Sequence, residues 1–301
     1  MSKTVALLFV FVFLAASCLI IVNLVSVTPQ DATLDFLTDV AGVDVTKYRI
    51  EEMYVPDDKL GGVVDQIVKY RLEADGSKME VISNLKNGAL VWCKIYRLEG
   101  SQILLKVPAV DALDSAISLM SRYQSVSKAS YLQPMQDSLN TLTELKSMTT
   151  KNGNMKLEVK NEGNYSWFWW TDTVNGIEIP QKTIGLTFYN GAFEQFGDYW
   201  NVYTVGNANV KFDREEAIQV AKELARNYSY TFGDTVVSNL TILDDYITTR
   251  LTMQDREKNC AVYPWWEIYL PLDKVYPGAV TRIHVNMWAD TGEVTYIQAL
   301  R

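Results

Sequence analysis

The N-terminal segment is the feature that most limits what this chain can be. Residues 4–27 read TVALLFVFVFLAASCLIIVNLVSV, in which almost every side chain is apolar and Asn23 is the one strongly polar residue. The segment is longer than the apolar region of a cleaved signal peptide, which has about 7–15 residues, and it reaches the length of about 20 residues that spans a bilayer. The sequence therefore predicts a membrane anchor within residues 1–30.

Charged residues flank this segment unequally. Lys3 precedes it, whereas Asp31, Asp35 and Asp39 follow it. Because basic residues collect on the cytoplasmic side of membranes, we expect a single-pass protein of the cell membrane, with its N-terminus in the cytoplasm and its body outside. The alternative is a signal sequence that is cleaved, with lipidation of Cys18 as one form of it, which gives a secreted body. Both interpretations place the body outside the cytoplasm.

The composition of the chain indicates a globular body. Of its 301 residues, 48% are apolar and 12% are aromatic, which is too hydrophobic for a disordered tail and sufficient for one or two packed cores. The net charge of −8, without a visible cluster of Lys and Arg, argues against binding to nucleic acid.

Cysteines and glycosylation triplets fit an exported protein. Cys93 and Cys260 are the two thiols outside the apolar segment, and outside the cytoplasm they could form a disulfide. The alternative is that Cys93, on the apolar face of the strand ALVWCKI, is a buried thiol without a partner. Asn164, Asn227 and Asn239 each begin a glycosylation triplet, although such triplets also arise by chance.

Alternating apolar and polar residues predict many strands. Asx-Gly dipeptides separate several of them, and these dipeptides favour the positive backbone angles of tight hairpins. The pattern predicts antiparallel meanders with two similar modules, an α+β module over residues 31–150 and a β-meander over residues 151–209. The expected strands are 45–55, 63–73, 78–84, 89–98, 156–161, 165–174, 177–189, 192–196, 199–205, 260–272, 279–290 and 293–300.

Apolar residues at helical spacing predict four amphipathic helices that cover these sheets, so the fold class is α+β. They are a short helix in residues 31–42 that ends at Gly42, helices over 111–124 and 134–148, and a helix that begins at Asp213 and extends to Tyr228. In the last of these, Asp213 and Glu216 have the spacing of a capping box. A final α+β domain is expected over residues 210–301.

This final segment resembles the PepSY family of small exported α+β domains. The similarity lies in the helix REEAIQVAKELA, the aromatic strand that ends in WWEIYLPL and the closing hairpin IHVNMWADTGEVTYI, where ADTGEV is similar to the family's Asp-x-x-Gly-Glu-Val finish but has one residue instead of two between Asp290 and Gly292. The resemblance implies a binding module associated with restraining or binding peptidases, without catalytic residues. The insert from Ser229 to Cys260 departs from the compact family pattern.

Residues suited to catalysis are few. His284 is the single histidine and lies on the polar face of its strand, with no second histidine to share a metal ion. Adjacent carboxylates occur at Asp57-Asp58, Glu215-Glu216 and Asp244-Asp245, but neighbouring residues point in different directions. The sequence therefore predicts no enzyme, no cofactor and no metal site. A hydrolase that uses two carboxylates is the least favoured alternative.

Tryptophans are the strongest candidates for a binding surface. Trp167, Trp169, Trp265 and Trp266 lie in two aromatic strands, and alternation must divide each run between the core and the opposite face. We therefore expect an extracytoplasmic binding protein, with an envelope protein or peptidase as its partner. A protein that binds glycans or the cell wall through exposed aromatic rings is the alternative.

Overall fold

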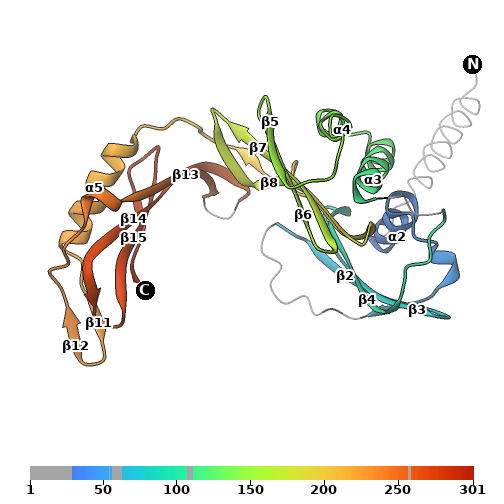
Figure 1. Cartoon of the computed structure of the whole chain (residues 1–301), viewed down its shortest axis with the longest axis horizontal. Helices are drawn as coiled ribbons and strands as arrows, with labels where there is room; N and C mark the ends of the chain where they lie inside the picture. Colours follow the sequence, from blue (N-terminus) through green and yellow to red (C-terminus); the bar gives the residue numbers. More distant parts are fainter. Residues whose placement is uncertain (1–28, 54, 56–62, 107–110, 257–258) are drawn as a thin grey trace, which may run out of the picture.

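The computed structural model describes residues 29–53, 55, 63–106, 111–256 and 259–301. Two sheets of mainly antiparallel strands dominate it, and together they form an arch with helices on its outer side (Figure 1). The expected α+β class with helix-covered antiparallel sheets is confirmed. The predicted anchor at residues 4–27 lies outside the described residues, and no helix within them is long and apolar enough to cross a membrane.

The larger sheet has nine strands in the order β1-β2-β3-β4-β9-β8-β7-β6-β5. Two consecutive meanders, β1 to β4 and β5 to β9, thus meet where β4 pairs with β9. Residues on both sides of position 150 therefore belong to one continuous sheet. The strands are β1 (Arg49–Met53), β2 (Gln66–Ala74), β3 (Ser77–Lys86), β4 (Ala89–Gly100), β5 (Met148–Asn152), β6 (Met155–Glu162), β7 (Tyr165–Val174), β8 (Ile177–Tyr189) and β9 (Ala192–Asp198).

Asn-Gly pairs form the tight turns that the sequence predicts. At Asn87-Gly88 the φ angles are 50° and 75°, and at Asn190-Gly191 they are 50° and 74°. Positive φ at both central residues gives the turn whose twist matches that of paired antiparallel strands. These turns explain why the hairpins β3–β4 and β8–β9 could be located from the sequence.

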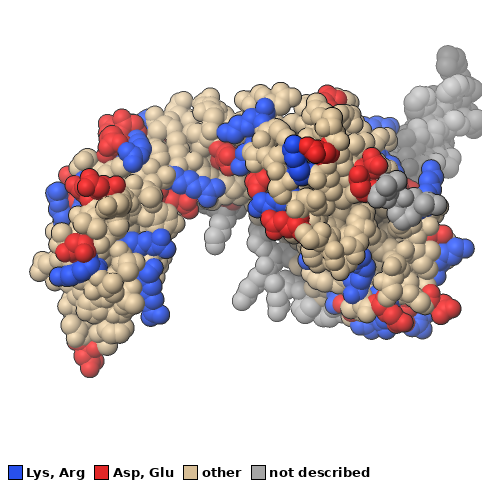
Figure 2. All heavy atoms as spheres, in the orientation of Figure 1, with Lys and Arg blue, Asp and Glu red and all other residues tan. Residues whose placement is uncertain are grey.

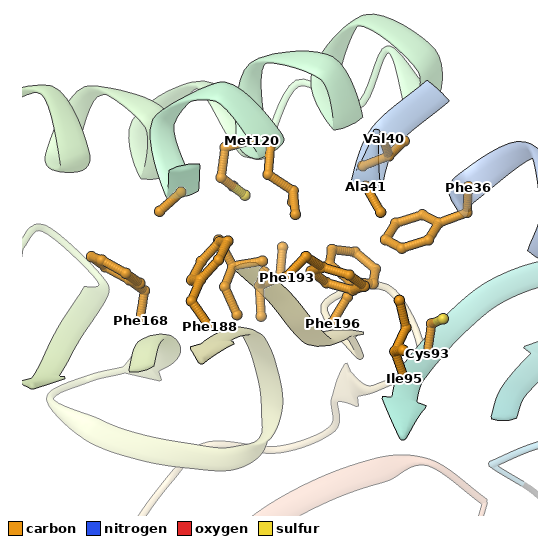
Figure 3. Packing of buried hydrophobic residues seen from close by; sticks show 14 of the residues in the cluster. Phe36, Val40, Ala41, Cys93, Ile95, Met120, Phe168, Phe188, Phe193 and Phe196 are labelled. Atoms are coloured by element: carbon orange, nitrogen blue, oxygen red, sulfur yellow. The ribbon is translucent and has the colours of Figure 1, made fainter. Parts of the chain in front are cut away.

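Helices cover one face of the nine-stranded sheet. They are α2 (Pro29–Asp35), which continues as the π-helical turn η1 (Phe36–Ala41), α3 (Ala112–Ser127) and α4 (Leu132–Asn140). Gly42 ends the first helix at φ 78°, as expected. Figure 3 shows Phe36 and Met120 from the helices facing Phe188 and Phe196 from the strands in one hydrophobic core.

The helix expected over residues 134–148 is shorter in the structure. It ends at Asn140, where the Ser138 hydroxyl donates to the carbonyl of Met135 and the Thr141 hydroxyl donates to the carbonyl of Ser138. Such bonds compete with continuation of the helix. Leu142 and Leu145 lie in irregular backbone, but their side chains still pack on the core. This burial explains why apolar residues continue at helical spacing in the sequence beyond the end of the helix.

The second sheet has helix α5 (Arg214–Arg226) on its outer face (Figure 1). The expected capping box between Asp213 and Glu216 is present. Leu224 follows the apolar spacing by which this helix was predicted, yet its side chain is 39% exposed, whereas Ile218 is buried. The strands of this sheet are β10 (Thr204–Val205), β13 (Thr248–Asp255), β14 (Ala261–Tyr276), β15 (Val280–Trp288) and β16 (Val294–Leu300), and β11 (Tyr230–Phe232) and β12 (Thr235–Val237) form a separate hairpin.

Two expectations about strands in this region need correction. Residues 199–205 contain only the two-residue strand β10, because Asn201 to Tyr203 form a turn and a loop. Strands β11, β12 and β13 lie within the insert from Ser229 to Cys260, where no strand was expected.

A small apolar cluster joins the two sheets. Ile177 and Ile179 of β8 pack against Met253 of β13 and Val262 of β14. Polar contacts reinforce this junction, since the Thr252 hydroxyl donates to the carbonyl of Glu178 at 3.3 Å. The end of the β7–β8 hairpin thus fixes the position of the second sheet.

Candidate ligand-binding surface

The helix-free face of the nine-stranded sheet carries a group of aromatic side chains. Alternation along β7 places Phe168 and Trp170 in the core, where both are 0% exposed, and places Trp167 and Trp169 on the opposite face. Trp169 is 39% exposed and Trp167 is half-buried. We call the following group the aromatic surface: Tyr165, Trp167 and Trp169 of β7 and Tyr189 of β8.

Contacts between the rings hold this surface in place. The ring centroids of Tyr165 and Trp167 lie 5.4 Å apart with planes inclined by only 12°. Tyr165 also meets Tyr189 edge to face at 4.9 Å, and the guanidinium carbon of Arg97 lies 4.4 Å from the Tyr189 ring centroid. The rings therefore form a pre-arranged surface, which costs a ligand little conformational entropy to bind.

Glycines let the aromatic layer lie flat on the strands. A Cβ atom at Gly185 would lie 2.5 Å from ring carbons of Trp169, so only glycine fits under this ring. In the register of the sheet, Gly185 of β8 lies opposite Gly197 of β9, and Gly197 in turn lies opposite Trp92 of β4. The ring of Tyr199 lies over Gly197. The rings of Trp169 and Tyr199 therefore shield the backbone of the sheet at the two glycines, which is a structural role that does not require a ligand.

Charged side chains from β6 border the tryptophans. In the register, Glu158 lies opposite Trp169 and Lys160 lies opposite Trp167. These residues and Glu162 line a shallow pocket of about 510 Å³ with the two indoles. Lys160 and Glu158 form an ion pair at 3.2 Å. The pocket thus combines flat apolar rings with fixed charges of both signs, which suits a ligand that has both polar and apolar parts.

Glu158, Lys160 and Glu162 were not among the residues predicted from the sequence. Their signal is present in the chain, because Glu158 and Lys160 alternate with the apolar residues of KLEVKN, Glu162 follows two positions later, and a short turn at Gly163-Asn164 joins their strand to β7. Reading the hairpin register across that turn would have placed them beside the tryptophans.

Trp265 and Trp266 lie elsewhere, on the second sheet. Trp266 is 7% exposed and its indole donates to the carbonyl of Phe212, so it belongs to the core and is withdrawn from the candidate surface. Trp265 is half-buried on the opposite face, where its ring centroid lies 4.5 Å from that of Trp288. Arg256 packs over Trp288 and pairs with Asp290. The structure therefore brings together only Trp167 and Trp169 of the four tryptophans.

His284 is packed between two tyrosines on that same face of the second sheet. Its ring is stacked on Tyr269 at 4.4 Å and meets Tyr296 at 5.4 Å. Burial is the main cause that lowers the pKa of His284 below its usual value. No group of three or more metal-binding side chains occurs within the described parts of the chain.

The acidic pairs have local structural roles where they are described. Glu216 belongs to the capping box, Glu215 pairs with Arg214 at 2.5 Å, and Asp244 pairs with Lys222 at 2.8 Å. Asp57-Asp58 lies outside the described residues. Glu158 and Glu162 share the aromatic pocket, where four residues along one strand separate their Cα atoms by about 13 Å.

The glycosylation candidates are all accessible. Asn164 lies in the turn between β6 and β7, Asn227 follows α5, and Asn239 has a positive φ of 58° in a loop. All three side chains are exposed, so their modification stays a prediction.

Cys93 and Cys260 form no disulfide in the structure. Cys93 is 0% exposed within the core of the nine-stranded sheet, as the alternative interpretation expected. Burial raises the pKa of its thiol to about 12 from an ordinary value of 9.0. Cys260 precedes β14, and burial also raises the pKa of its thiol.

The buried Cys93 thiol predicts a specific loss of stability at alkaline pH. Above pH 9.0 the unfolded thiol releases its proton while the folded one retains it up to about pH 12, so the free energy of unfolding falls as pH rises between these values. From pH 8.5 to 10.5 we expect Cys93 to contribute a loss of about 2 kcal/mol. Urea unfolding of the wild type and Cys93→Ala measures this loss as the difference between their pH profiles. Parallel profiles would contradict it.

The fold and this surface define an α+β protein with an aromatic, charge-bordered pocket on an open sheet face. No family model matches the sequence, and no curated protein matches it. Among solved structures, the chain is similar to the Bacillus megaterium YpeB C-terminal domain, with a TM-score of 0.36 and 13% sequence identity over 90% of this chain and 97% of that chain. A similarity of this size assigns no activity or ligand.

Proposed function

We propose that this chain is a binding protein of the cell envelope, and that it holds a protein or peptide partner on the aromatic surface. The observation that carries the proposal is that the exposed Trp169 and the half-buried Trp167 lie together beside Glu158 and Lys160. Tryptophan and tyrosine supply large contact areas with few rotatable bonds, and they dominate the energetics of protein interfaces. The proposal involves no reaction.

Two features of the sequence support the compartment and the kind of partner. The apolar segment at residues 4–27 favours a body outside the cytoplasm. The PepSY-like pattern in residues 210–301 favours a peptidase as the partner. Lys and Arg are interspersed with Asp and Glu on the face seen in Figure 2, so binding would depend on local pairing of charges.

The test compares two exposed apolar side chains of equal exposure. Trp169 and Leu224 are both 39% exposed, the first on the aromatic surface and the second on α5. The full-length chain is added to the envelope peptidases of its host, and binding and residual peptidase activity are measured. We expect Trp169→Ala to weaken binding by about 2 kcal/mol or more, as truncation of a central interface tryptophan does, and Leu224→Ala to leave it unchanged. Absence of binding would refute the peptidase partner, and equal binding by both variants would refute the aromatic surface as its binding site.

A glycan is the second candidate ligand. The nearly parallel rings of Tyr165 and Trp167, with the carboxylates of Glu158 and Glu162 nearby, resemble the combination of ring faces and hydrogen-bond acceptors that sugars require. Titration with cell-wall glycans while tryptophan fluorescence is recorded tests it. A change in the wild type that is lost in Trp169→Ala supports a glycan, and an unchanged spectrum across the panel excludes one.

A further inference from the structure

A second cleft lies on the helix side of the nine-stranded sheet, away from the aromatic surface. It has a volume of about 420 Å³ and lies between η1, α3 and the segment that follows β4. Its polar lining includes Thr38, Ser118, Lys106 and Arg122, and Leu105 at its edge is 51% exposed. Nothing in the aromatic surface depends on this cleft.

Among the described residues, Arg122 has no partner that accounts for its charge. Its Nε atom is buried without a hydrogen bond, and no carboxylate forms an ion pair with it within the described residues. Burial lowers the pKa of Arg122, as expected for a cation that is removed from water without compensation. A partly buried cation without a partner is costly for the folded protein, and an anion in the cleft would remove that cost.

The end of the neighbouring helix does not supply the missing acceptor. The guanidinium of Arg122 lies against Gly42, where a Cβ atom would be 3.1 Å from Nη1. The carbonyl of Gly42 already accepts a hydrogen bond from the amide of Leu105 at 2.9 Å. Proximity to a helix C-terminus favours a cation by only about 0.3–1 kcal/mol. Glycine at position 42 therefore makes room for the guanidinium but does not bind it.

We propose that this cleft binds the carboxylate of a ligand with an apolar substituent. Arg122 and Lys106 carry two positive charges, and Asp39 at the same cleft carries one negative charge, so a single negative charge balances the site. The guanidinium fork matches a carboxylate in geometry, and the Ser118 hydroxyl is a further donor. Leu105 and Leu119 provide apolar contacts for the substituent.

The test uses a matched pair of small ligands with the full-length chain. N-acetyl-leucine has the carboxylate and the apolar side chain, whereas N-acetyl-leucinamide lacks the negative charge. Isothermal titration calorimetry should show the acid binding at least about 10-fold more tightly than the amide, because charge-assisted hydrogen bonds exceed neutral ones. Equal affinities would overturn the proposal.

Variants show whether the cleft is the site. Arg122→Gln should weaken binding of the acid about 10- to 100-fold, and Lys106→Gln, which removes an exposed charge, should weaken it less than 10-fold. If Arg122→Gln fails to fold, Ser118→Phe on the exposed side of α3 closes the cleft and should abolish binding. Trp169→Ala should leave binding of the acid unchanged, which separates this site from the proposed function. Unchanged affinity in the folded Arg122→Gln variant, or in Ser118→Phe, would overturn the proposal.

The source of the carboxylate is settled by a second pair of ligands. A pentapeptide that ends in leucine with a free C-terminus is compared with the same peptide amidated. Tighter binding of the free peptide than of N-acetyl-leucine indicates a polypeptide terminus as the ligand, and weaker binding indicates a small free acid. Both results support a carboxylate site, whereas equal binding of the free and amidated peptides together with failure of N-acetyl-leucine to bind would refute it.

Discussion

Replacing Asp198 by alanine is expected to destabilise the protein by about 3–5 kcal/mol. Asp198 is 6% exposed at the end of β9, and its Oδ2 atom accepts hydrogen bonds from the hydroxyls of Tyr123 and Tyr131, both at 2.6 Å. Its Oδ1 atom accepts from the amide of Trp200 at 3.0 Å. Hydrogen bonds to a charged acceptor contribute about 1.5–3 kcal/mol each, and Asp198→Ala leaves the donors without it.

Urea unfolding followed by circular dichroism measures this loss. Burial raises the pKa of Tyr123 and of Tyr131, so both hydroxyls remain donors well into the alkaline range. The control is Asp137→Ala on α4, where the carboxylate is exposed and accepts a hydrogen bond from the side chain of Gln133. This variant should stay within about 0.5 kcal/mol of the wild type. A loss for Asp198→Ala no larger than that of the control would show that Asp198 does not stabilise the helix–sheet contact.

Local signals in the sequence were sufficient for most of the strands. β7 and β8 begin and end at the residues that alternation predicts, because Gly163-Asn164, Asn175-Gly176 and Asn190-Gly191 interrupt the pattern at each turn. Asp213 and Glu216 likewise mark the start of α5 through contacts three residues apart. These features depend on neighbours in the chain, so one sequence is enough to recognise them.

Features that depend on distant residues were not predictable in this way. Asp198 contacts side chains 75 and 67 positions away, and no local pattern distinguishes it from a surface aspartate. The helix expected over residues 134–148 was predicted too long because Leu145 contacts distant core residues from backbone that is not helical, and its apolar side chain alone does not reveal this. β13 was overlooked because its sequence TTRLTMQD has few apolar residues, although it pairs with β14 and packs on β8.

The candidate site shows the same limit. Alternation separates Trp167 and Trp169 from Phe168 and Trp170, but it does not say which pair is buried. That choice depends on α3 and α4, which cover only one face of the sheet, as Figure 1 shows. Trp266 was predicted to lie on a surface, but its indole is buried and donates to the carbonyl of Phe212, 54 residues earlier in the chain. The sequence of the strand that contains Trp266 does not reveal this distant contact.

Trp170→Ala should therefore destabilise the protein by about 3–5 kcal/mol, the usual loss for a fully buried aromatic side chain. Trp170 is 0% exposed, packs in the core of the nine-stranded sheet and donates from its indole to the Ser138 hydroxyl of α4 at 2.9 Å. Trp170→Phe should cost only about 1–2 kcal/mol, because the ring is retained and Ser138 still donates to the carbonyl of Met135. Urea unfolding monitored by circular dichroism compares these variants with the wild type.

The adjacent Trp169 is the natural control, because the two residues differ in the face they occupy. Trp169→Ala removes a side chain that is 39% exposed and uncovers Gly185 beneath it, so we expect a loss of stability of about 1 kcal/mol or less. The same variant should lose binding at the aromatic surface, whereas Trp170→Phe should keep it. If both alanine variants lost stability equally, the assignment of one face to the core and the other to a ligand would be refuted.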